Sequence, residues 1–320
     1  MMTNDKRYGT VVRSTGGAYV VRTDTGDYIE CKLRGKMRLS KTSTTNPVAV
    51  GDRVQIDTDD GQTHAIVEVV DRRNCIVRRS TNLSKQAHVI AANIDQALLV
   101  ATLAHPETST VFIDRFLVSA EAFGVRTIIA FNKTDLYDDE TQRELEELES
   151  LYTKIGYKTV RLSATKREGI DTLSEILKGK TTVISGNSGV GKSTIINALE
   201  PNLNLRTDEI SVQNDTGKHT TTFATMHPLS IGGDIIDTPG VRGFGIFDIP
   251  HSEVAHYFTE FFNRLSECRY PNCTHTHEPG CAVRMAVEEG EIAVSRYNSY
   301  LNILDEDKDE KYRQGYGLRR

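Results

Sequence analysis

The stretch Gly186-Asn187-Ser188-Gly189-Val190-Gly191-Lys192-Ser193 determines how the rest of this 320-residue chain is interpreted. It fits the pattern G-x-x-x-x-G-K-[ST], in which glycines allow several backbone N–H groups to point at a phosphate. The β-prone run Thr181–Ser185 precedes it and the helix-forming run Lys192–Leu199 follows. A bound phosphate would therefore meet a helix N-terminus, and this context argues against a chance glycine-rich turn.

A second motif supplies the base specificity that a phosphate loop lacks. Asn132-Lys133-Thr134-Asp135 ends the apolar run Thr127–Phe131. A carboxylate at Asp135 can accept two hydrogen bonds from the N1–H and N2–H₂ edge of guanine, which adenine does not offer. We expect Asn132 to face the opposite base edge and the stem of Lys133 to lie along the base or ribose. The alternative is a solvated turn after a strand.

Three further segments complete a nucleotide site. Ser163-Ala164 follows the short run Thr159–Leu162, where a backbone N–H can reach the guanine carbonyl. Asp237-Thr238-Pro239-Gly240 follows Asp234–Ile236, so Asp237 can hold Mg²⁺ through water and the Gly240 N–H can face a γ-phosphate. Between them, the polar run Lys218–Thr222 suits a switch segment whose threonine completes the metal shell, and its three adjacent threonines leave the ligand open.

The candidate site residues follow from these motifs. The predicted GTP-binding residues are Asn132, Lys133, Thr134, Asp135, Ser163, Ala164, Gly186, Asn187, Ser188, Gly189, Val190, Gly191, Lys192, Ser193, Thr194, Asp237 and Gly240. The predicted Mg²⁺ ligands are Ser193, Thr221 and Asp237. We expect Lys192 to reach the β- and γ-phosphates.

The order of the motifs predicts a circular permutation. The base-binding segments come first, then the phosphate loop, then the two switch segments. A nucleotide site needs its loops at the carboxyl ends of parallel strands, whichever strand comes first in the chain. The second switch then lies at the C-terminal exit of the nucleotide domain, so we expect the segment that follows it to respond directly to the γ-phosphate.

The N-terminal residues predict a small β-barrel. Residues 1–85 carry 15 Lys and Arg against 10 Asp and Glu, whereas the whole chain has a net charge of −5. Five short β-prone runs suggest a closed barrel of the OB type: Gly9–Arg13, Ala18–Arg22, Tyr28–Lys32, Arg53–Asp57 and Ala65–Val70. Such barrels hold nucleic acid on a basic face. The candidate RNA-binding residues are Lys32, Arg34, Lys36 and Arg38, and the alternative is a solvated basic loop.

A compact group of cysteine and histidine residues lies near the C-terminus. Cys268, Cys273, His275 and Cys281 form the pattern C-x₄-C-x-H-x₅-C, with His277 as a rival fourth ligand. Three cysteines within 14 residues point to tetrahedral Zn²⁺ rather than to disulfides. Four protein ligands leave no open position, so we expect a structural zinc. Cys31 and Cys75 are interpreted as buried residues without a chemical role.

These patterns predict an α/β chain of three domains. We expect an OB-type barrel over residues 1–75, a linker over 76–90, a permuted P-loop GTPase domain over 91–247, and a helical zinc-binding domain over 248–320. Helices are expected over Ser252–Leu265 and Ala282–Leu304, followed by a charged, frayed tail from Asp305 to Arg320. No apolar run approaches 18 residues and the segment Met1–Tyr8 is polar, so we expect a cytoplasmic protein without a membrane contact. No long exposed heptad suggests self-association, so we expect a monomer.

The motif order, the basic barrel and the C-x₄-C-x-H-x₅-C knuckle together resemble the bacterial family of circularly permuted ribosome small subunit biogenesis GTPases, called RsgA or YjeQ. The resemblance covers nearly the whole chain. It implies a GTPase that binds the 30S ribosomal subunit and its 16S rRNA during late maturation. It also implies ribosome-stimulated hydrolysis of GTP to GDP and phosphate, with release coupled to hydrolysis.

The catalytic residue is a separate question. Ras-type GTPases orient the attacking water with a glutamine just after D-x-x-G, but Val241 occupies that position here and cannot do so. The resemblance implies that the histidine of the first switch, His219, takes this role, and the alternative is a solvated loop residue. Arg242 can contribute charge stabilisation, although no motif requires it.

Three other functions compete with this interpretation. A GTP-gated RNA-binding module with little catalytic role would show nucleotide-dependent RNA affinity and very low turnover. A zinc-dependent hydrolase would need an open metal position, which the four-ligand pattern disfavours. An ATP-using enzyme is disfavoured by Asp135.

Overall fold

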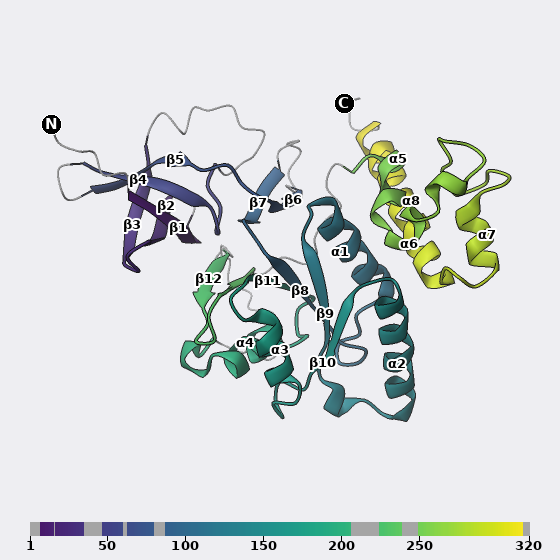
Figure 1. Ribbon diagram of the computed structural model, residues 1–320, viewed down its shortest axis with the longest axis horizontal. Coiled ribbons are helices and arrows are strands. Elements are labelled where there is room, and N and C mark those ends of the chain that lie inside the picture. Colours follow the sequence, from purple (N-terminus) through teal and green to yellow (C-terminus); the bar gives the residue numbers. More distant parts are fainter. Residues whose placement is uncertain are drawn as a thin grey trace.

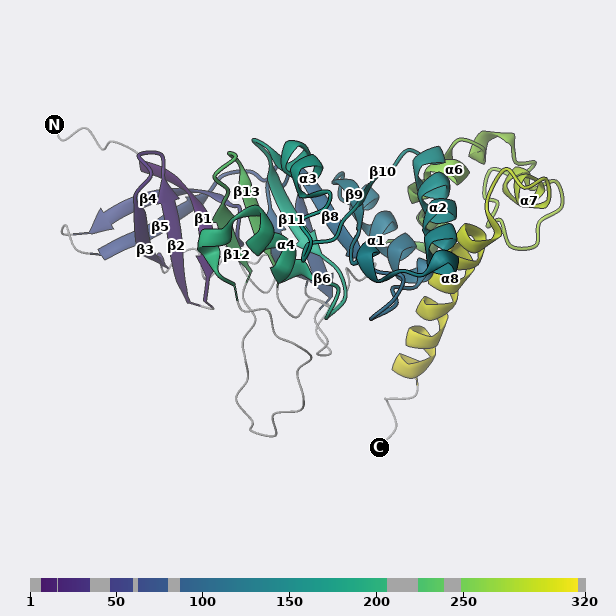
Figure 2. The ribbon, with the colours of Figure 1, turned by 90° about the horizontal axis from the view of Figure 1, so that it is seen from below.

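The computed structural model describes residues 7–15, 17–34, 47–59, 63–79, 87–205, 224–238 and 249–315. Three units follow one another along its longest axis, as Figure 1 and Figure 2 show: a barrel of N-terminal strands, a central sheet flanked by helices, and a C-terminal group of helices. Within these described ranges, no helix is long and apolar enough to cross a membrane.

The N-terminal unit is a closed five-stranded barrel, which confirms the predicted OB-type fold. Its strands are β1 (Arg7–Ser14), β2 (Ala18–Thr23), β3 (Tyr28–Leu33), β4 (Arg53–Asp59) and β5 (Thr63–Val69). The first three strands are antiparallel, β3 pairs with β5 in parallel, and β4 pairs with both β5 and β1 to close the barrel. The side chains that point inward are apolar and include Val11, Val21, Val54 and Ile66.

The expected linker over 76–90 contains regular structure. Strands β6 (Cys75–Arg79) and β7 (Ala87–Ala92) pair antiparallel in a separate two-stranded sheet. Its apolar side chains enter different cores, because Ile76 packs with the main cluster of the central unit and Val77 packs against Ala49 beside the barrel. Burial in two directions explains why the sequence shows no clear period.

The central unit is a twisted sheet in the order β10-β9-β8-β11-β13-β12, parallel except at β12. Its strands are β8 (Gln96–Ala101), β9 (Arg126–Phe131), β10 (Lys158–Arg161), β11 (Thr181–Ser185), β12 (Thr225–Pro228) and β13 (Asp234–Asp237). Its helices are α1 (Thr110–Ala122), α2 (Asp139–Lys154), α3 (Ile170–Leu177) and α4 (Lys192–Leu199). The central strands β8, β9 and β11 are buried almost throughout because helices cover both faces of the sheet.

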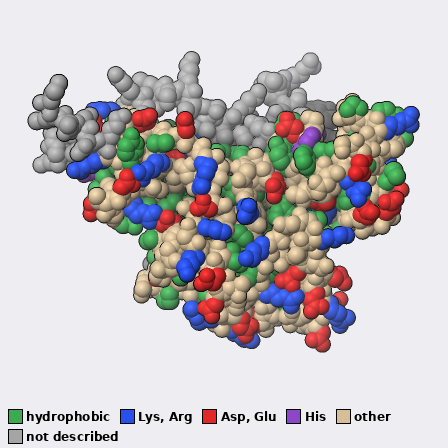
Figure 3. All heavy atoms as spheres, viewed as in Figure 1, with side chains coloured by type: hydrophobic (Ala, Val, Ile, Leu, Met, Phe, Trp, Pro, Cys, Tyr) green, Lys and Arg blue, Asp and Glu red, His purple; other side chains and the backbone are tan. Residues whose placement is uncertain are grey.

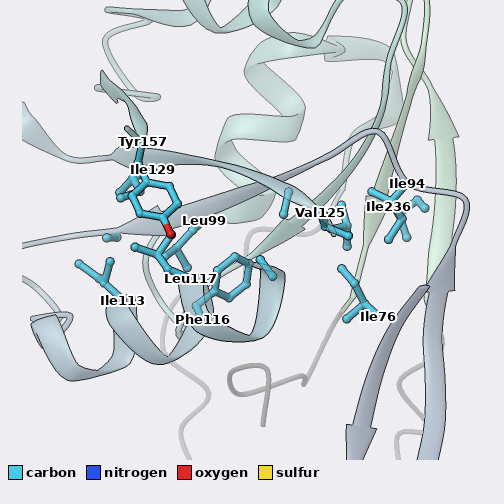
Figure 4. Close-up of a cluster of buried hydrophobic side chains, with 14 of the residues drawn as sticks. Ile76, Ile94, Leu99, Ile113, Phe116, Leu117, Val125, Ile129, Tyr157 and Ile236 are labelled. Atoms are coloured by element: carbon cyan, nitrogen blue, oxygen red, sulfur yellow. The ribbon is translucent and has the colours of Figure 1, made fainter. Parts of the chain in front are cut away.

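Two hydrophobic clusters lie on the two faces of this sheet. The cluster in Figure 4 packs α1, through Ile113, Phe116 and Leu117, against strand residues such as Leu99 and Ile129. On the other face, α3 and α4 pack against alternate residues of the same strands. The layers fix the carboxyl ends of the parallel strands at one edge, where the sequence motifs begin.

The barrel and the central sheet are joined edge to edge. Strand β1 meets β12 at the register pair Arg13 and Thr225, which makes one continuous sheet of eleven strands. A bidentate ion pair reinforces the joint, because Arg22 Nη1 and Nη2 donate to the two carboxylate oxygens of Asp234 over 2.7 and 2.8 Å. Asp234 is the first residue of β13, so the barrel contacts both strands that follow the first switch segment and precede the second.

The C-terminal unit differs from the prediction in its helix boundaries. The expected helix Ser252–Leu265 is broken into α5 (His251–Val254), the 3₁₀ turn Ala255–Tyr257, α6 (Thr259–Phe262) and the 3₁₀ turn Leu265–Glu267. The break lies at Phe258, whose backbone is extended (φ −93°, ψ 106°) and whose ring stacks on Phe261 in the core. Packing of these two rings against Tyr300 takes precedence over helix continuity here.

The expected helix Ala282–Leu304 is also two helices. It divides into α7 (Ala282–Glu288) and α8 (Val294–Gly315). Gly290 ends α7 in the left-handed conformation (φ 74°) that favours glycine at a helix C-terminus. The prediction of a frayed tail from Asp305 was wrong up to Gly315, because α8 continues to that residue.

A buried charge network attaches the C-terminal unit to α1. Arg296 of α8 is 1% exposed and donates to Asp114 of α1 over 2.7 Å and to Glu260 over 2.6 Å. Its guanidinium carbon also lies 4.5 Å from the centre of the Phe258 ring. Tyr152 of α2 donates to the same Asp114 oxygen over 2.9 Å. The C-terminal unit is therefore held on the central sheet by charges as well as by apolar packing.

Candidate nucleotide site and metal centre

The segment Gly186–Ser193 connects β11 to α4, as the motif requires. Gly186 has φ 147°, and a Cβ at this position would lie 2.3 Å from the carbonyl oxygen of Val100. Gly191 has φ 97°, and a Cβ there would lie 2.4 Å from the side-chain nitrogen of Asn132. Only glycine fits these two positions without displacing the backbone of β8 or the side chain of Asn132. Ser193 and Thr194 lie half-buried in the first turn of α4, and Asn187 and Ser188 lie at the loop's outer side.

Lys192 folds back over this loop. Its ammonium donates to the carbonyl oxygens of Gly186 (2.8 Å) and Asn187 (2.7 Å). Burial lowers the pKa of Lys192, and the charge of Asp237 at the end of β13 opposes that shift. Burial likewise raises the pKa of Asp237, which Lys192 and His227 partly offset. A cation and an anion thus face each other beside the loop, where a polyphosphate and its metal ion need opposite charges.

Asn132 joins three of the predicted segments. Its side chain is 2% exposed; Nδ2 donates to the Val190 carbonyl over 2.8 Å, and Oδ1 accepts from the Ala164 N–H over 3.2 Å. Ser163 and Ala164 are themselves buried, and the Ser163 hydroxyl accepts from the Lys166 N–H. The base-binding segments and the phosphate loop, distant in sequence, therefore meet at one amide.

The other residues of the N-K-T-D segment are oriented by their neighbours. Lys133 adopts a left-handed backbone (φ 64°), and its ammonium donates to the carbonyl oxygen of His105. Thr134 donates to the Leu162 carbonyl through both its N–H and its hydroxyl, each over 3.1 Å. Asp135 lies in the following 3₁₀ turn and is half-exposed. Its carboxylate is thus available at the surface beside Lys133.

Several predicted residues lie outside the described ranges. They are the catalytic candidate His219, the metal-ligand candidate Thr221, Gly240 with its neighbours Val241 and Arg242, and the basic residues Lys36 and Arg38. For these residues the predictions stay predictions. Of the three predicted Mg²⁺ ligands, Ser193 and Asp237 lie within the described ranges.

The basic barrel residues are placed only in part. Lys32 is exposed on β3, and Arg34 follows that strand and pairs with Asp57 over 2.9 Å. On the face shown in Figure 3, blue Lys and Arg side chains alternate with red Asp and Glu side chains. The described residues of this face present mixed charge rather than one basic field.

The four predicted zinc ligands lie together in the C-terminal unit. The sulfur atoms of Cys268, Cys273 and Cys281 and a ring nitrogen of His275 all lie within 4.8 Å of one another. His275 Nδ1 is 3.4 Å from the sulfur of Cys281 and 3.6 Å from that of Cys268. A tetrahedral zinc ion, with bonds of about 2.3 Å to sulfur and about 2.0 Å to nitrogen, places such atoms about 3.5 Å apart. The four residues therefore fit a closed zinc site.

The structure distinguishes the two histidine candidates. His275 is 3% exposed and has a left-handed backbone (φ 57°) that turns its ring toward the cysteines. His277 is exposed, and its Nδ1 lies 2.8 Å from the Thr276 hydroxyl instead. Tyr297 donates to the carbonyl of His275 over 2.7 Å and so ties the knuckle to α8. This arrangement favours His275 as the fourth ligand.

Sequence reasoning missed Tyr137, whose hydroxyl donates to the Asn132 carbonyl and accepts from the Leu103 N–H, each over 2.8 Å. It also missed the loop that includes Thr102 and His105, which touches the N-K-T-D segment. No motif includes these residues, and only their proximity in the fold reveals them.

Two family models match this chain. Residues 69–247 match the family described as RsgA GTPase, and residues 8–66 match the RsgA N-terminal domain. The chain belongs to the RsgA GTPase family. Members of the RsgA family are GTP hydrolases, and the permuted order of the nucleotide segments agrees with this assignment.

Two curated RsgA proteins and two solved structures show how far the similarity extends. The small ribosomal subunit biogenesis GTPase RsgA of Bacteroides fragilis is 54% identical over 96% of this chain and 99% of its own length. The protein of the same name from Flavobacterium johnsoniae is 49% identical over 97% and 96%. YjeQ from Thermotoga maritima has a TM-score of 0.76 at 39% identity, covering 94% of this chain and 98% of its own. YloQ, a circularly permuted GTPase, has a TM-score of 0.74 at 28% identity, covering 97% and 98%.

Proposed function

We propose that the chain is a GTPase that binds the small (30S) ribosomal subunit, assists its late maturation, and hydrolyses GTP in a ribosome-stimulated manner. The proposed GTP binding rests on one observation. The Gly186–Ser193 loop, Asn132 and Ala164 lie in contact at one edge of the sheet. The ribosomal part is supported by the relatives, whose names describe small ribosomal subunit biogenesis.

Each residue of the site receives a role in this proposal. The N–H groups of the Gly186–Gly191 loop and the ammonium of Lys192 bind the phosphates, and Asp135 selects guanine. Mg²⁺ would be held by Ser193 of the phosphate loop, Asp237 at the end of β13 and Thr221 of the first switch. The bound ion would neutralise charge on the phosphates. Lys192 exchanges its two loop carbonyls for phosphate oxygens, which are stronger acceptors because they are ionised.

His219 is the proposed residue that orients the attacking water. If a His219→Ala enzyme bound GTP normally and kept full 30S-stimulated turnover, this assignment would be wrong. The RNA-contacting role is proposed for Lys32, Arg34, Lys36 and Arg38 of the barrel, and the 16S rRNA is the proposed partner. We also propose a cytoplasmic monomer.

The C-terminal knuckle is proposed to bind one structural Zn²⁺ through Cys268, Cys273, His275 and Cys281. The four-ligand geometry supports this role, because a closed shell leaves no position for a substrate or water. Zinc here holds a loop together and takes no part in hydrolysis.

The decisive experiment measures GTP hydrolysis by the purified chain alone and with 30S, 50S or 70S particles at fixed salt. Selective stimulation by 30S supports the proposal. The matched control is Asp135→Asn, which should lose activity with GTP and regain it with xanthosine triphosphate, because the amide complements the xanthine edge. The alternative, a GTP-gated RNA-binding module, predicts GTP-dependent RNA affinity with very low turnover in every mixture.

A further inference from the structure

The loop between β8 and α1, residues 102–109, is a closed turn held by its own hydrogen bonds. The Thr102 hydroxyl donates to the carbonyl of Pro106, and Thr102 is fully buried. Thr108 closes the turn twice, because its N–H donates to the Thr102 carbonyl over 2.7 Å and its hydroxyl accepts from the Thr102 N–H over 3.1 Å. The turn ends at Ser109, which caps α1. Such a closed turn has a defined shape without any ligand.

This turn touches the nucleotide segments at three points. The Lys133 ammonium donates to the carbonyl of His105. The Tyr137 hydroxyl lies between the Leu103 N–H and the Asn132 carbonyl, 2.8 Å from each. On the phosphate side, the Pro106 ring approaches Gly189, where a Cβ would lie 3.4 Å from the ring. The turn therefore contacts the base-binding segment and the phosphate loop simultaneously.

We propose that the 102–109 turn braces the guanine side of the nucleotide site, and that Thr102 and Tyr137 are positioning residues for guanine recognition. The inference rests on the proposed nucleotide roles of Lys133 and Asp135. It adds residues that no nucleotide motif includes. Neither Thr102 nor Tyr137 needs to touch the nucleotide, because both act through the turn.

The physical reason lies in how Lys133 is held. The Lys133 residue is half-buried, and the His105 carbonyl accepts a hydrogen bond from its ammonium at the far end of the side chain. With both ends anchored, the methylene stem is fixed as a surface for the base. Asp135, two residues on, then has a defined position relative to that surface. Loss of the Thr102 hydroxyl leaves the Pro106 carbonyl without its donor and loosens the His105 carbonyl beside it.

The test compares Thr102→Val with Thr127→Val. Thr127 lies on β9 and is equally buried, and among the described residues its hydroxyl has no hydrogen-bond partner. Both variants make the same chemical change in the same domain. Thr102→Ser should restore the hydroxyl, and Tyr137→Phe removes the second contact. The dissociation constants for GDP and IDP are measured by titration without ribosomal particles, so the outcome is independent of ribosome stimulation.

We expect Thr102→Val and Tyr137→Phe each to weaken GDP binding about two- to tenfold, the range of one lost hydrogen bond. The preference for GDP over IDP should also fall, because IDP lacks the N2 amino group that a misplaced Asp135 no longer reaches. Thr127→Val should change neither quantity, and Thr102→Ser should recover most of both. An unchanged GDP-to-IDP preference in folded Thr102→Val and Tyr137→Phe proteins overturns the proposal. If Thr102→Val does not fold, Tyr137→Phe with the serine variant decides it.

Discussion

The ion pair between Arg22 and Asp234 is the contact whose removal tests how the barrel and the nucleotide domain communicate. Arg22 lies in barrel strand β2, and Asp234 begins β13, which ends at the proposed metal ligand Asp237. Replacement of Arg22 by Met retains most of the apolar stem and removes the charge. We expect the variant to fold, to hydrolyse GTP alone at the normal rate, and to respond less to 30S particles.

The magnitude follows from geometry and exposure. The pair is bidentate at 2.7 and 2.8 Å, and its side chains are 26% and 12% exposed. Exposed pairs contribute about 0–1 kcal/mol and the loss of one partner of a fully buried pair costs about 3–5 kcal/mol. An intermediate value of about 2 kcal/mol therefore applies, which corresponds to at most about a thirtyfold loss of stimulation if the whole energy serves coupling.

The assay is a double-mutant cycle with Arg22→Met, Asp234→Asn and the double variant, read in thermal unfolding and in 30S-stimulated turnover. The matched control is Arg53→Met, which removes an arginine that pairs with Asp24 inside the barrel and not with the central sheet. The charge-reversed pair Arg22→Asp with Asp234→Arg should recover part of the response. If Arg22→Met keeps full stimulation while the native enzyme is clearly stimulated, the junction does not transmit the signal. If the native enzyme itself is not stimulated, the proposed function fails instead.

Three further predictions concern stability and metal. Replacement of Arg296 by Met should destabilise the C-terminal unit by about 3–5 kcal/mol, because the buried Asp114 loses its countercharge; chemical denaturation with near-ultraviolet detection of the tyrosines measures it. Removal of zinc by a chelator should unfold the C-terminal unit and leave GDP binding intact, and loss of both together would contradict a purely structural metal. Burial raises the pKa of the Cys31 thiol to about 11, above that of an unfolded thiol, so its protonated form stabilises the barrel below pH 9 and this contribution is lost as the pH rises through 11. Cys31→Ala should lessen the alkaline loss of stability measured by thermal melts across this window, and an unchanged loss would show that burial in the barrel does not raise the pKa of this thiol.

The sequence predicted what depends on local spacing. Three motifs each span only a short stretch of sequence: the phosphate loop, the N-K-T-D segment and the zinc knuckle. Their chemistry can therefore be predicted without knowledge of the fold. The permuted order was readable for the same reason, because each segment could be assigned by itself. The structure brings the phosphate loop, Asn132 and Ala164 together as the permutation requires.

The missed features depend on partners far away in the chain. No local pattern marks Arg296 as a buried residue. Its burial depends on the carboxylate of Asp114, which lies 182 residues earlier in the chain. The turn closed by Thr102 carries no recognisable pattern, since its role arises only where Lys133 meets it. Gly290 is different, because a glycine inside a predicted helix is a local stop signal that was available from the sequence.

The barrel and the C-terminal unit are attached to different parts of the nucleotide domain. Strands β12 and β13 follow the first switch segment and precede the second, and the barrel holds this pair through Arg13–Thr225 pairing and the Arg22–Asp234 ion pair. The C-terminal unit follows the second switch in the chain but is anchored elsewhere, on α1 through Arg296 and Asp114. Because α1 begins at the turn that contacts Lys133, that anchor lies on the guanine side of the site. We therefore expect a change in the γ-phosphate to reach the barrel through the sheet, whereas the C-terminal unit is tied to the side of the proposed site that would hold the base in GTP and GDP alike.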